Sequence, residues 1–272
     1  MSDIKTIIDR TKNKIINKDE YTFMPDHNTS IKLTDQVLLY NIGQKWKIIP
    51  LIIALSYPII YDSYETTDGI FHVTIVICPI TLRAVILKGV FQFVTYENFT
   101  MMLNEYEKDN LISVDSGFKI GKDYVVQHNK RFGIMICTLR NALVFTPDIN
   151  YMIINSNKPI DTVVNMEYYS NNFNIDGDIV ETSIHPKTLC YLIQIKKKRE
   201  KVKQYLLLGI DSSKDDITGY DIKKSGIYDY LNNHNDKIIE KEAYILPMLW
   251  YMAKMLYPNA KLLNSQNNTS HK

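Results

Sequence analysis

The cysteine and histidine side chains carry the most reactive chemistry in this sequence. Cys78 ends an apolar run, and His72 precedes it by six positions. A thiol becomes a nucleophile when a nearby imidazole removes its proton. On an extended strand, six residues at about 3.3 Å each place these two side chains about 20 Å apart. A thiol-dependent enzyme using Cys78 would therefore need a bend that brings His72 closer, or a histidine from elsewhere in the chain, His128 or His185.

The number and spacing of the cysteines favour a structural role. Cys78, Cys137 and Cys190 form an odd and sparse set, which argues against a disulfide framework. No C-x-x-C pair occurs, so paired thiolates for a structural zinc site are missing. A buried free cysteine behaves as a small apolar residue. We therefore expect no metal, no cofactor and no catalytic residue, with a Cys78 enzyme as the alternative.

The usual motifs of nucleotide-binding and hydrolytic sites do not occur in this chain. We find no G-x-G-x-x-G, no G-x-x-x-x-G-K-[ST], no G-x-S-x-G and no H-E-x-x-H. Only ten glycines occur in 272 residues, which leaves few positions for phosphate-binding loops. These patterns favour a non-catalytic protein over an enzyme.

A short basic run could contact nucleic acid. It lies between apolar runs at 189–195 and 205–210, both of which predict strands. Lysine and arginine side chains bind phosphates, but a charged run between two strands is also typical of a solvated hairpin tip. We expect the hairpin tip and keep nucleic-acid binding as an alternative. The candidate binding residues are Lys196, Lys197, Lys198, Arg199, Lys201 and Lys203.

The composition limits the class of protein and the cellular compartment that we expect. The 32 basic and 30 acidic residues give a net charge of +2, which provides no long-range attraction toward phosphate or acidic lipid. Isoleucine, asparagine, lysine and tyrosine make up 107 residues, a usage typical of AT-rich genomes such as those of giant DNA viruses. The longest apolar stretch, 48–61, is shorter than the ~20 residues of a membrane span. We expect buried core there and an intracellular protein, in the host cytoplasm or in a virion.

The apolar spacing predicts helices near both ends and strands between them. Residues 3–17 are amphipathic with basic flanks, typical of a helix docked on its own domain or of one that binds a membrane surface or a partner. Residues 96–110 and 241–257 also fit helices. Strands are predicted at 70–77, 82–87, 132–137 and 142–145, with a hairpin turn at 64–69.

These elements predict an α+β fold, with a strand-dominated mixed or antiparallel sheet core and helices at the N- and C-terminal ends. The expected organisation is an N-terminal helix within 1–24, a single α+β domain over 25–263 and a polar tail over 264–272.

Three short blocks resemble a widespread, functionally uncharacterised bacterial and archaeal domain family. Its pattern has a Tyr-Pro segment, a Gly turn and a Tyr-Cys-Pro-Leu-Cys or Cys-Pro-Leu-Thr strand, then a Phe-Gly-Val block and a closing Trp block. The matching residues are Tyr57, Pro58, Gly69, Cys78, Pro79, Thr81, Phe132, Gly133, Ile134, Leu143, Val144, Trp250, Tyr257, Pro258, Asn259, Lys261, Leu262 and Leu263. Here Thr81 replaces the second cysteine, Leu87-Lys88-Gly89 replaces Phe-Asp-Arg, and the Trp-His-Glu stretch is missing. The resemblance therefore implies a chain without the polar groups of that family.

Taken together, these patterns predict a non-catalytic, intracellular or virion-associated binding or structural protein. Its expected partner is another protein or a second copy of itself. A thiol-dependent or other small-molecule enzyme and a nucleic-acid-binding protein are the alternatives.

Overall fold

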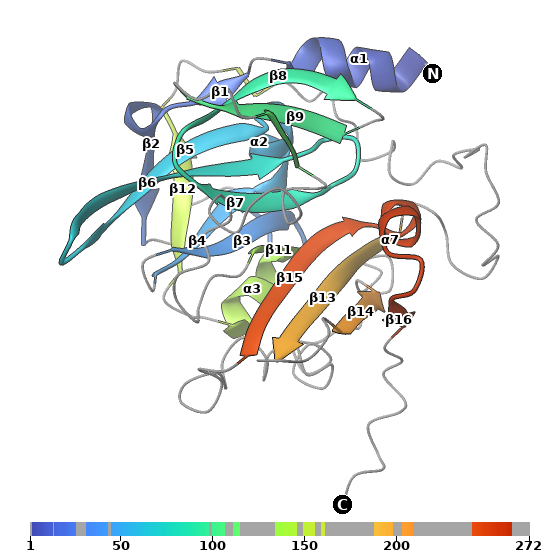
Figure 1. Cartoon of the computed structure of the whole chain (residues 1–272). Helices are drawn as coiled ribbons and strands as arrows, with labels where there is room; N and C mark the ends of the chain where they lie inside the picture. Colours follow the sequence, from blue (N-terminus) through green and yellow to red (C-terminus); the bar gives the residue numbers. More distant parts are fainter. Residues whose placement is uncertain are drawn as a thin grey trace, which may run out of the picture.

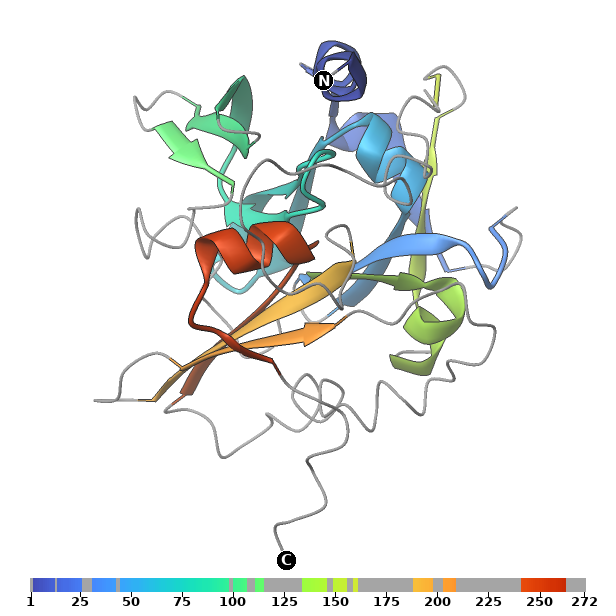
Figure 2. The same cartoon turned by 90° about the vertical axis from the view of Figure 1, so that its right-hand side faces the viewer.

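The computed structural model describes residues 2–12, 14–25, 31–42, 45–97, 100–106, 111–114, 134–145, 149–155, 159–160, 188–197, 203–208 and 241–262. Within these residues the protein is dominated by strands in mixed and antiparallel sheets, with a few short helices (Figures 1 and 2).

Four sheets contain the strands, and we number them in chain order of their first strands. The first sheet has the order β1 (Ile15–Ile16), β5 (Ile59–Thr66), β6 (Gly69–Ile77) and β7 (Ala84–Lys88). The second has the order β11 (Ile134–Thr138), β3 (Gln36–Ile42), β4 (Lys45–Pro50), β12 (Asn150–Ile154) and β2 (Tyr21–Met24). The third has the order β10 (Leu111–Ser113), β9 (Thr100–Glu105) and β8 (Phe91–Glu97). The fourth has the order β15 (Lys241–Leu249), β13 (Leu189–Lys197), β14 (Lys203–Leu208) and β16 (Lys261–Leu262).

The hairpin turn predicted at 64–69 is confirmed. β5 and β6 pair antiparallel from Ile59 opposite Val76 to Thr66 opposite Gly69, which leaves Thr67 and Asp68 as the turn. Gly69 has φ +124°, a conformation that other residues adopt only with strain. β7 then pairs with β6, so the predicted strands at 70–77 and 82–87 are both present.

The helix predicted over 96–110 is wrong. β8 and β9 form an antiparallel pair there, with one irregularity between Phe93 and Thr95. Met101 and Leu103 are fully buried, and Met102 beside them is buried too. A strand covered on both faces reads as a continuous apolar run, which sequence periodicity does not separate from a helix.

The strand predicted at 142–145 is also wrong, because this segment is the end of helix α3 (Leu139–Phe145). The Thr138 hydroxyl oxygen accepts a hydrogen bond of 3.3 Å from the Asn141 backbone N–H, as a helix-capping side chain does. Leu139 and Ala142, three positions apart, are both buried in a small apolar cluster. That spacing is helical, and the segment was too short for periodicity to show it.

The C-terminal helix is shorter than predicted. The first half of the expected helix at 241–257 is strand β15, and helix α7 covers only Trp250–Leu256. β15 pairs with β13 along nine residues, from Leu189 opposite Leu249 to Lys197 opposite Lys241. Pro247 is tolerated because β15 lies at the edge of its sheet. Short helices also occur inside the chain, at α2 (Leu51–Ser56) and α3.

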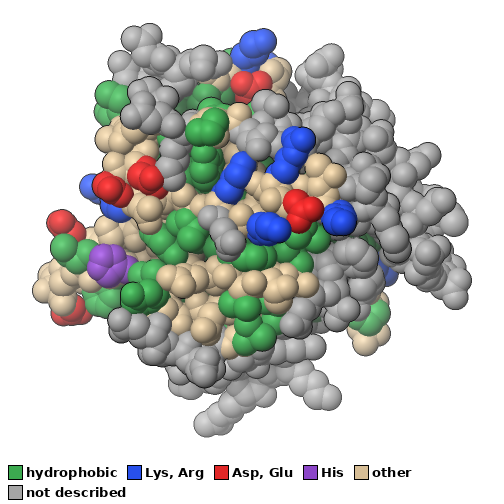
Figure 3. All heavy atoms as spheres, turned by 90° about the horizontal axis from the view of Figure 1, so that it is seen from above, with side chains coloured by type: hydrophobic (Ala, Val, Ile, Leu, Met, Phe, Trp, Pro, Cys, Tyr) green, Lys and Arg blue, Asp and Glu red, His purple; other side chains and the backbone are tan. Residues whose placement is uncertain are grey.

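The N-terminal segment begins with helix α1 (Ser2–Thr11), shorter than the helix expected over 3–17. Ile7 and Thr11 are buried, and the Thr11 hydroxyl lies 3.5 Å from the Tyr96 hydroxyl, so the apolar face of α1 docks on its own domain. The basic side chains of α1 face solvent, and Figure 3 shows Lys and Arg gathered on this end of the molecule.

Residues 15–24 then join two sheets. β1 pairs in parallel with β5 at the edge of the first sheet, and β2 pairs antiparallel with β12 at the edge of the second. The 3-10 helix η1 (Lys18–Glu20) connects the two strands. We call residues 15–24 the N-terminal strap.

One hydrophobic cluster connects all four sheets. It includes Leu38 of the second sheet, Ile75 of the first, Leu103 of the third and Leu192 of the fourth. Residues 48–61 contribute heavily to it, and Ile52 is their one exposed side chain, so the expectation of buried core there is confirmed. None of the helices that the structure describes is long and apolar enough to cross a membrane.

Candidate functional site

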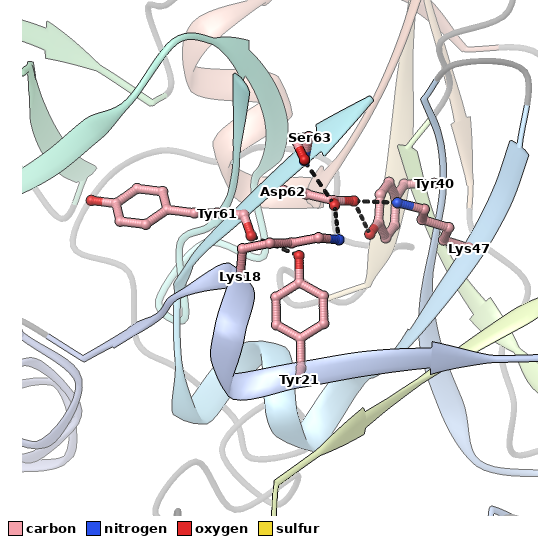
Figure 4. Close-up of polar contacts among 7 residues, drawn as sticks. All are labelled: Lys18, Tyr21, Tyr40, Lys47, Tyr61, Asp62 and Ser63. Carbon is pink, nitrogen blue, oxygen red and sulfur yellow. Dashed lines mark hydrogen bonds and ion pairs between the residues drawn. The ribbon is translucent and has the colours of Figure 1, made fainter. Parts of the chain in front are cut away.

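A charged cluster lies where the N-terminal strap meets the first two sheets. Its centre is Asp62 on β5, a strand that begins with two isoleucines and a tyrosine before this charge. The side chain of Asp62 is completely buried. We call Lys18, Tyr40, Lys47 and Asp62 the Asp62 cluster (Figure 4).

Four donors saturate the two carboxylate oxygens of Asp62. Oδ1 accepts hydrogen bonds from Lys18 Nζ at 2.7 Å and from the Ser63 backbone N–H at 2.8 Å. Oδ2 accepts hydrogen bonds from Lys47 Nζ at 2.6 Å and from the Tyr40 hydroxyl at 3.0 Å. A buried charge is tolerated only when it is paired and hydrogen-bonded in this way. The arrangement leaves Asp62 without an open position for general-base chemistry.

The ionisation of the cluster follows from its burial and charges. Burial raises the pKa of Asp62, but Lys47 and Lys18 more than offset this and hold its pKa below the ordinary value. Burial lowers the pKa of Lys47, and Asp62 opposes that change. Burial and the negative charge of Asp62 both raise the pKa of Tyr40 well above its ordinary range. Asp62 is therefore an anion, and Tyr40 is a neutral donor, at neutral pH.

Aromatic rings surround the two lysines. The Lys18 ammonium lies 4.8 Å from the Tyr21 ring centroid and 5.5 Å from that of Phe23. The Lys47 ammonium lies 4.5 Å from the Phe23 ring centroid. The Tyr21 hydroxyl donates a 2.7 Å hydrogen bond to the Tyr61 carbonyl and so fixes its ring beside Lys18. These cation–π contacts add to the attraction of the carboxylate.

A second buried polar feature is the tight turn between β6 and β7. The Cys78 N–H donates to the Arg83 carbonyl at 2.7 Å, and the Leu82 N–H donates to the Cys78 carbonyl at 2.9 Å. Leu82 has φ +54°, an uncommon conformation for a residue other than glycine. Arg83 is completely buried, and its Nη1 lies 3.7 Å from Met248 Sδ. This turn connects the first sheet to the fourth.

The predicted cysteine and histidine candidates are not brought together where the structure describes them. Cys78 is completely buried and directly follows strand β6, whereas His72 is exposed on β6 itself. His128 and His185 lie outside the described residues. The pairing of Cys78 with either of them therefore stays a prediction.

The other two thiols are held in their neutral form. Burial raises the pKa of Cys137 to about 12. Burial also raises the pKa of Cys190 to about 12, although Arg83 opposes the change. A thiolate is the reactive species, so neither group is a nucleophile near neutral pH.

The predicted basic run lies at the connection of two paired strands. β13 and β14 pair antiparallel, with Ile195 opposite Lys203, so the strands that flank the basic run form a hairpin. Lys196 and Lys197 belong to β13, and Lys203 belongs to β14. Lys198, Arg199 and Lys201 lie outside the described residues.

The Asp62 cluster was missed by sequence reasoning. The available signal was a charged residue inside each of two apolar strands, Lys47 before Ile48 and Asp62 after Tyr61. Charged side chains are rarely buried unless they are paired, so opposite charges inside two apolar strands indicate that the fold brings them together. Among the described residues, no group of three or more His, Cys, Asp or Glu could hold a metal ion.

No protein-family model, curated protein or solved structure matches this chain.

Proposed function

We propose that this chain is a non-catalytic binding or structural protein. The observation that carries the proposal is the saturation of Asp62 by four donors from η1, β3, β4 and its own strand. Its buried charge holds the strap and two sheets in register, which is a structural use of groups that an enzyme would leave open to a substrate.

The compartment and the family resemblance are part of the same proposal. Residue usage supports an intracellular or virion setting in a large DNA virus. Backbone hydrogen bonds join residues at or beside the matched blocks: the Ile77 N–H donates to the Pro58 carbonyl at 3.0 Å, and the Leu249 N–H donates to the Thr81 carbonyl at 3.0 Å. The matched residues Cys78 and Trp250 are both completely buried, which is consistent with packing roles.

Alkylation by iodoacetamide at pH 8 tests this proposal against the thiol-dependent enzyme. We expect Cys78 and Cys190 to react in the folded protein at least about 100-fold more slowly than in urea-unfolded protein, because only opening of the core exposes them. Peptide mass spectrometry assigns each site. Fast labelling of Cys78 in the folded chain would contradict the proposal and favour the enzyme.

Nucleic-acid binding stays the second alternative, favoured by the convergence of Lys196, Lys197 and Lys203 at one end of the β13–β14 hairpin. If it operates, replacing these three lysines by glutamine weakens binding to a fluorescent duplex and lowers its salt dependence. Equal binding by both proteins, measured by anisotropy, would exclude this hairpin as the contact.

A further inference from the structure

The ammonium group of Lys18 is held much as a binding protein holds a ligand cation. A buried carboxylate oxygen lies 2.7 Å away, and the rings of Tyr21 and Phe23 lie beside it. We call Tyr21, Phe23 and Asp62 the cation box. Carboxylates and aromatic faces together are the groups that recognise alkylammonium ions.

The two lysines of the cluster reach Asp62 from different environments. The Lys47 side chain is only 11% exposed, so it completes the interior of the site. The Lys18 side chain is 51% exposed and enters from the solvent side. Lys18 can therefore leave for water without opening the core, whereas Lys47 cannot.

We propose that the cation box is a binding site for a primary alkylammonium group, and that Lys18 is its built-in competitor. The exchange leaves no charge without a partner. An incoming ammonium takes over the hydrogen bond to Asp62 Oδ1, and the displaced Lys18 ammonium is hydrated by water. Lys47, Tyr40 and the Ser63 N–H keep the remaining bonds to Asp62. The inference deepens the proposed binding role by naming a ligand class.

Lys18 competes strongly with a free ligand for Asp62, because the chain holds Lys18 next to the site. Lys18 lies on η1, whose first turn is fixed by hydrogen bonds from the Asn17 backbone N–H and side-chain amide to the Glu20 carboxylate, at 2.7 and 3.1 Å. A tethered group acts at an effective concentration in the millimolar range or above. A free ligand therefore binds the wild-type protein weakly, and binds much better once the Lys18 side chain is removed.

The test uses Lys18→Ala with n-propylammonium chloride as the probe. This substitution removes three carbons and the ammonium nitrogen, which are the atoms that propylammonium supplies. Lys18→Met is the matched control, because its uncharged chain still covers the rings. The backbone amide of Ser63, which donates to Asp62 Oδ1, reports binding by NMR, with sodium chloride at equal ionic strength as the reference.

We expect Lys18→Ala to bind propylammonium at least about tenfold more tightly than the wild-type protein or Lys18→Met, and to gain thermal stability with it. Equally weak propylammonium-dependent shifts of the Ser63 amide signal in all three proteins would overturn the proposal. If Lys18→Ala does not fold, Lys18→Ser takes its place as the variant without a competing ammonium, and a propylammonium affinity no higher than that of Lys18→Met then overturns the proposal.

A second experiment distinguishes two sources of the ammonium group, a lysine of a protein partner and a free small amine. A short peptide with a blocked N-terminus and one lysine is compared with the same peptide acetylated on that lysine, and with free propylammonium. Tighter binding of the lysine peptide than of propylammonium points to a protein partner, and equal binding points to a small amine. Binding of the acetylated peptide as tight as the unmodified one would contradict the site. This result is independent of the thiol alkylation test, so either proposal can fail alone.

Discussion

At the scale of single residues, Asp62 has the largest expected effect on stability. Its carboxylate is the counter-charge of Lys47, whose side chain is almost fully buried. Breaking a buried pair leaves an uncompensated charge, which costs about 3–5 kcal/mol. We expect Asp62→Asn to lower the free energy of unfolding by this amount in urea titrations.

The matched control for this substitution is Asp9→Asn. Asp9 pairs with Lys12 at 3.2 Å on the surface of α1, and both side chains are about half exposed. Exposed pairs contribute about 0–1 kcal/mol. Equal losses in the two variants would show that the Asp62 cluster does not stabilise the fold.

The pH dependence of stability tests the same carboxylate. Because the folded-state pKa of Asp62 lies below its ordinary value, the unfolded chain binds more protons as the pH falls. Its contribution is complete above an unfolded pKa of about 3.9 and is lost as the pH falls through the folded pKa. We expect the difference between wild-type protein and Asp62→Asn to be constant from pH 7 to 5 and to shrink below pH 4. A difference that grows toward acid pH would have the wrong sign.

The residues of the candidate site were predicted less well from the sequence than the strands were. Cys78 drew attention because of its type, yet it lies in the core. Asp62 and Lys47 lie fifteen positions apart on different sheets, and only the tertiary arrangement brings them within hydrogen-bonding distance. No local pattern encodes that distance.

At the scale of elements, the docking of α1 gives a prediction for adjacent isoleucines. Ile7 is buried against the domain, whereas Ile8 is only partly buried. We expect Ile7→Ala to lower the free energy of unfolding of the α1 region by about 2 kcal/mol or more, and Ile8→Ala by clearly less. Hydrogen exchange of the α1 amides measures both effects. Equal losses would mean that α1 does not dock by this face.

The β5–β6 turn gives a prediction about backbone strain. Gly69 has φ +124°, and a Cβ atom added there would meet no atom within 4 Å. Gly69→Ala therefore lowers the free energy of unfolding through the backbone alone, by about 1–2 kcal/mol. Thr67→Ala in the same exposed turn should cost about 0.5 kcal/mol or less. Urea titrations compare the two, and a neutral Gly69→Ala would contradict the turn conformation.

The elements predicted correctly were those with local signals. The β5–β6 hairpin has a Gly turn and flanking apolar strands, and β13 and β14 flank a charged run. The errors occurred where burial on both sides of a strand imitated a helix, as at Met101 to Leu103, and where pairing with β13 extended β15. Long-range pairing decided these cases.

At the scale of the whole molecule, the continuous core predicts one cooperative unfolding transition. The chain has two tryptophans: Trp250 lies in the main cluster, and Trp46 packs against the small one. In Trp46→Phe the fluorescence reports on Trp250, and in Trp250→Phe it reports on Trp46. We expect each variant to show the same urea midpoint by fluorescence as by circular dichroism. Separate midpoints within one variant would show that the two clusters unfold independently.

The two-sided pairing of the N-terminal strap also bears on how the chain is made. Residues 15–24 leave the ribosome before their partner strands, but β1 needs residues 59–60 and β2 needs residues 151–154 before either can form its ladder. Closing such distant contacts is slow. The N-terminal strap is thus among the last of the described parts to reach its native place, and nascent chains stalled before residue 150 contain β2 without its partner strand β12.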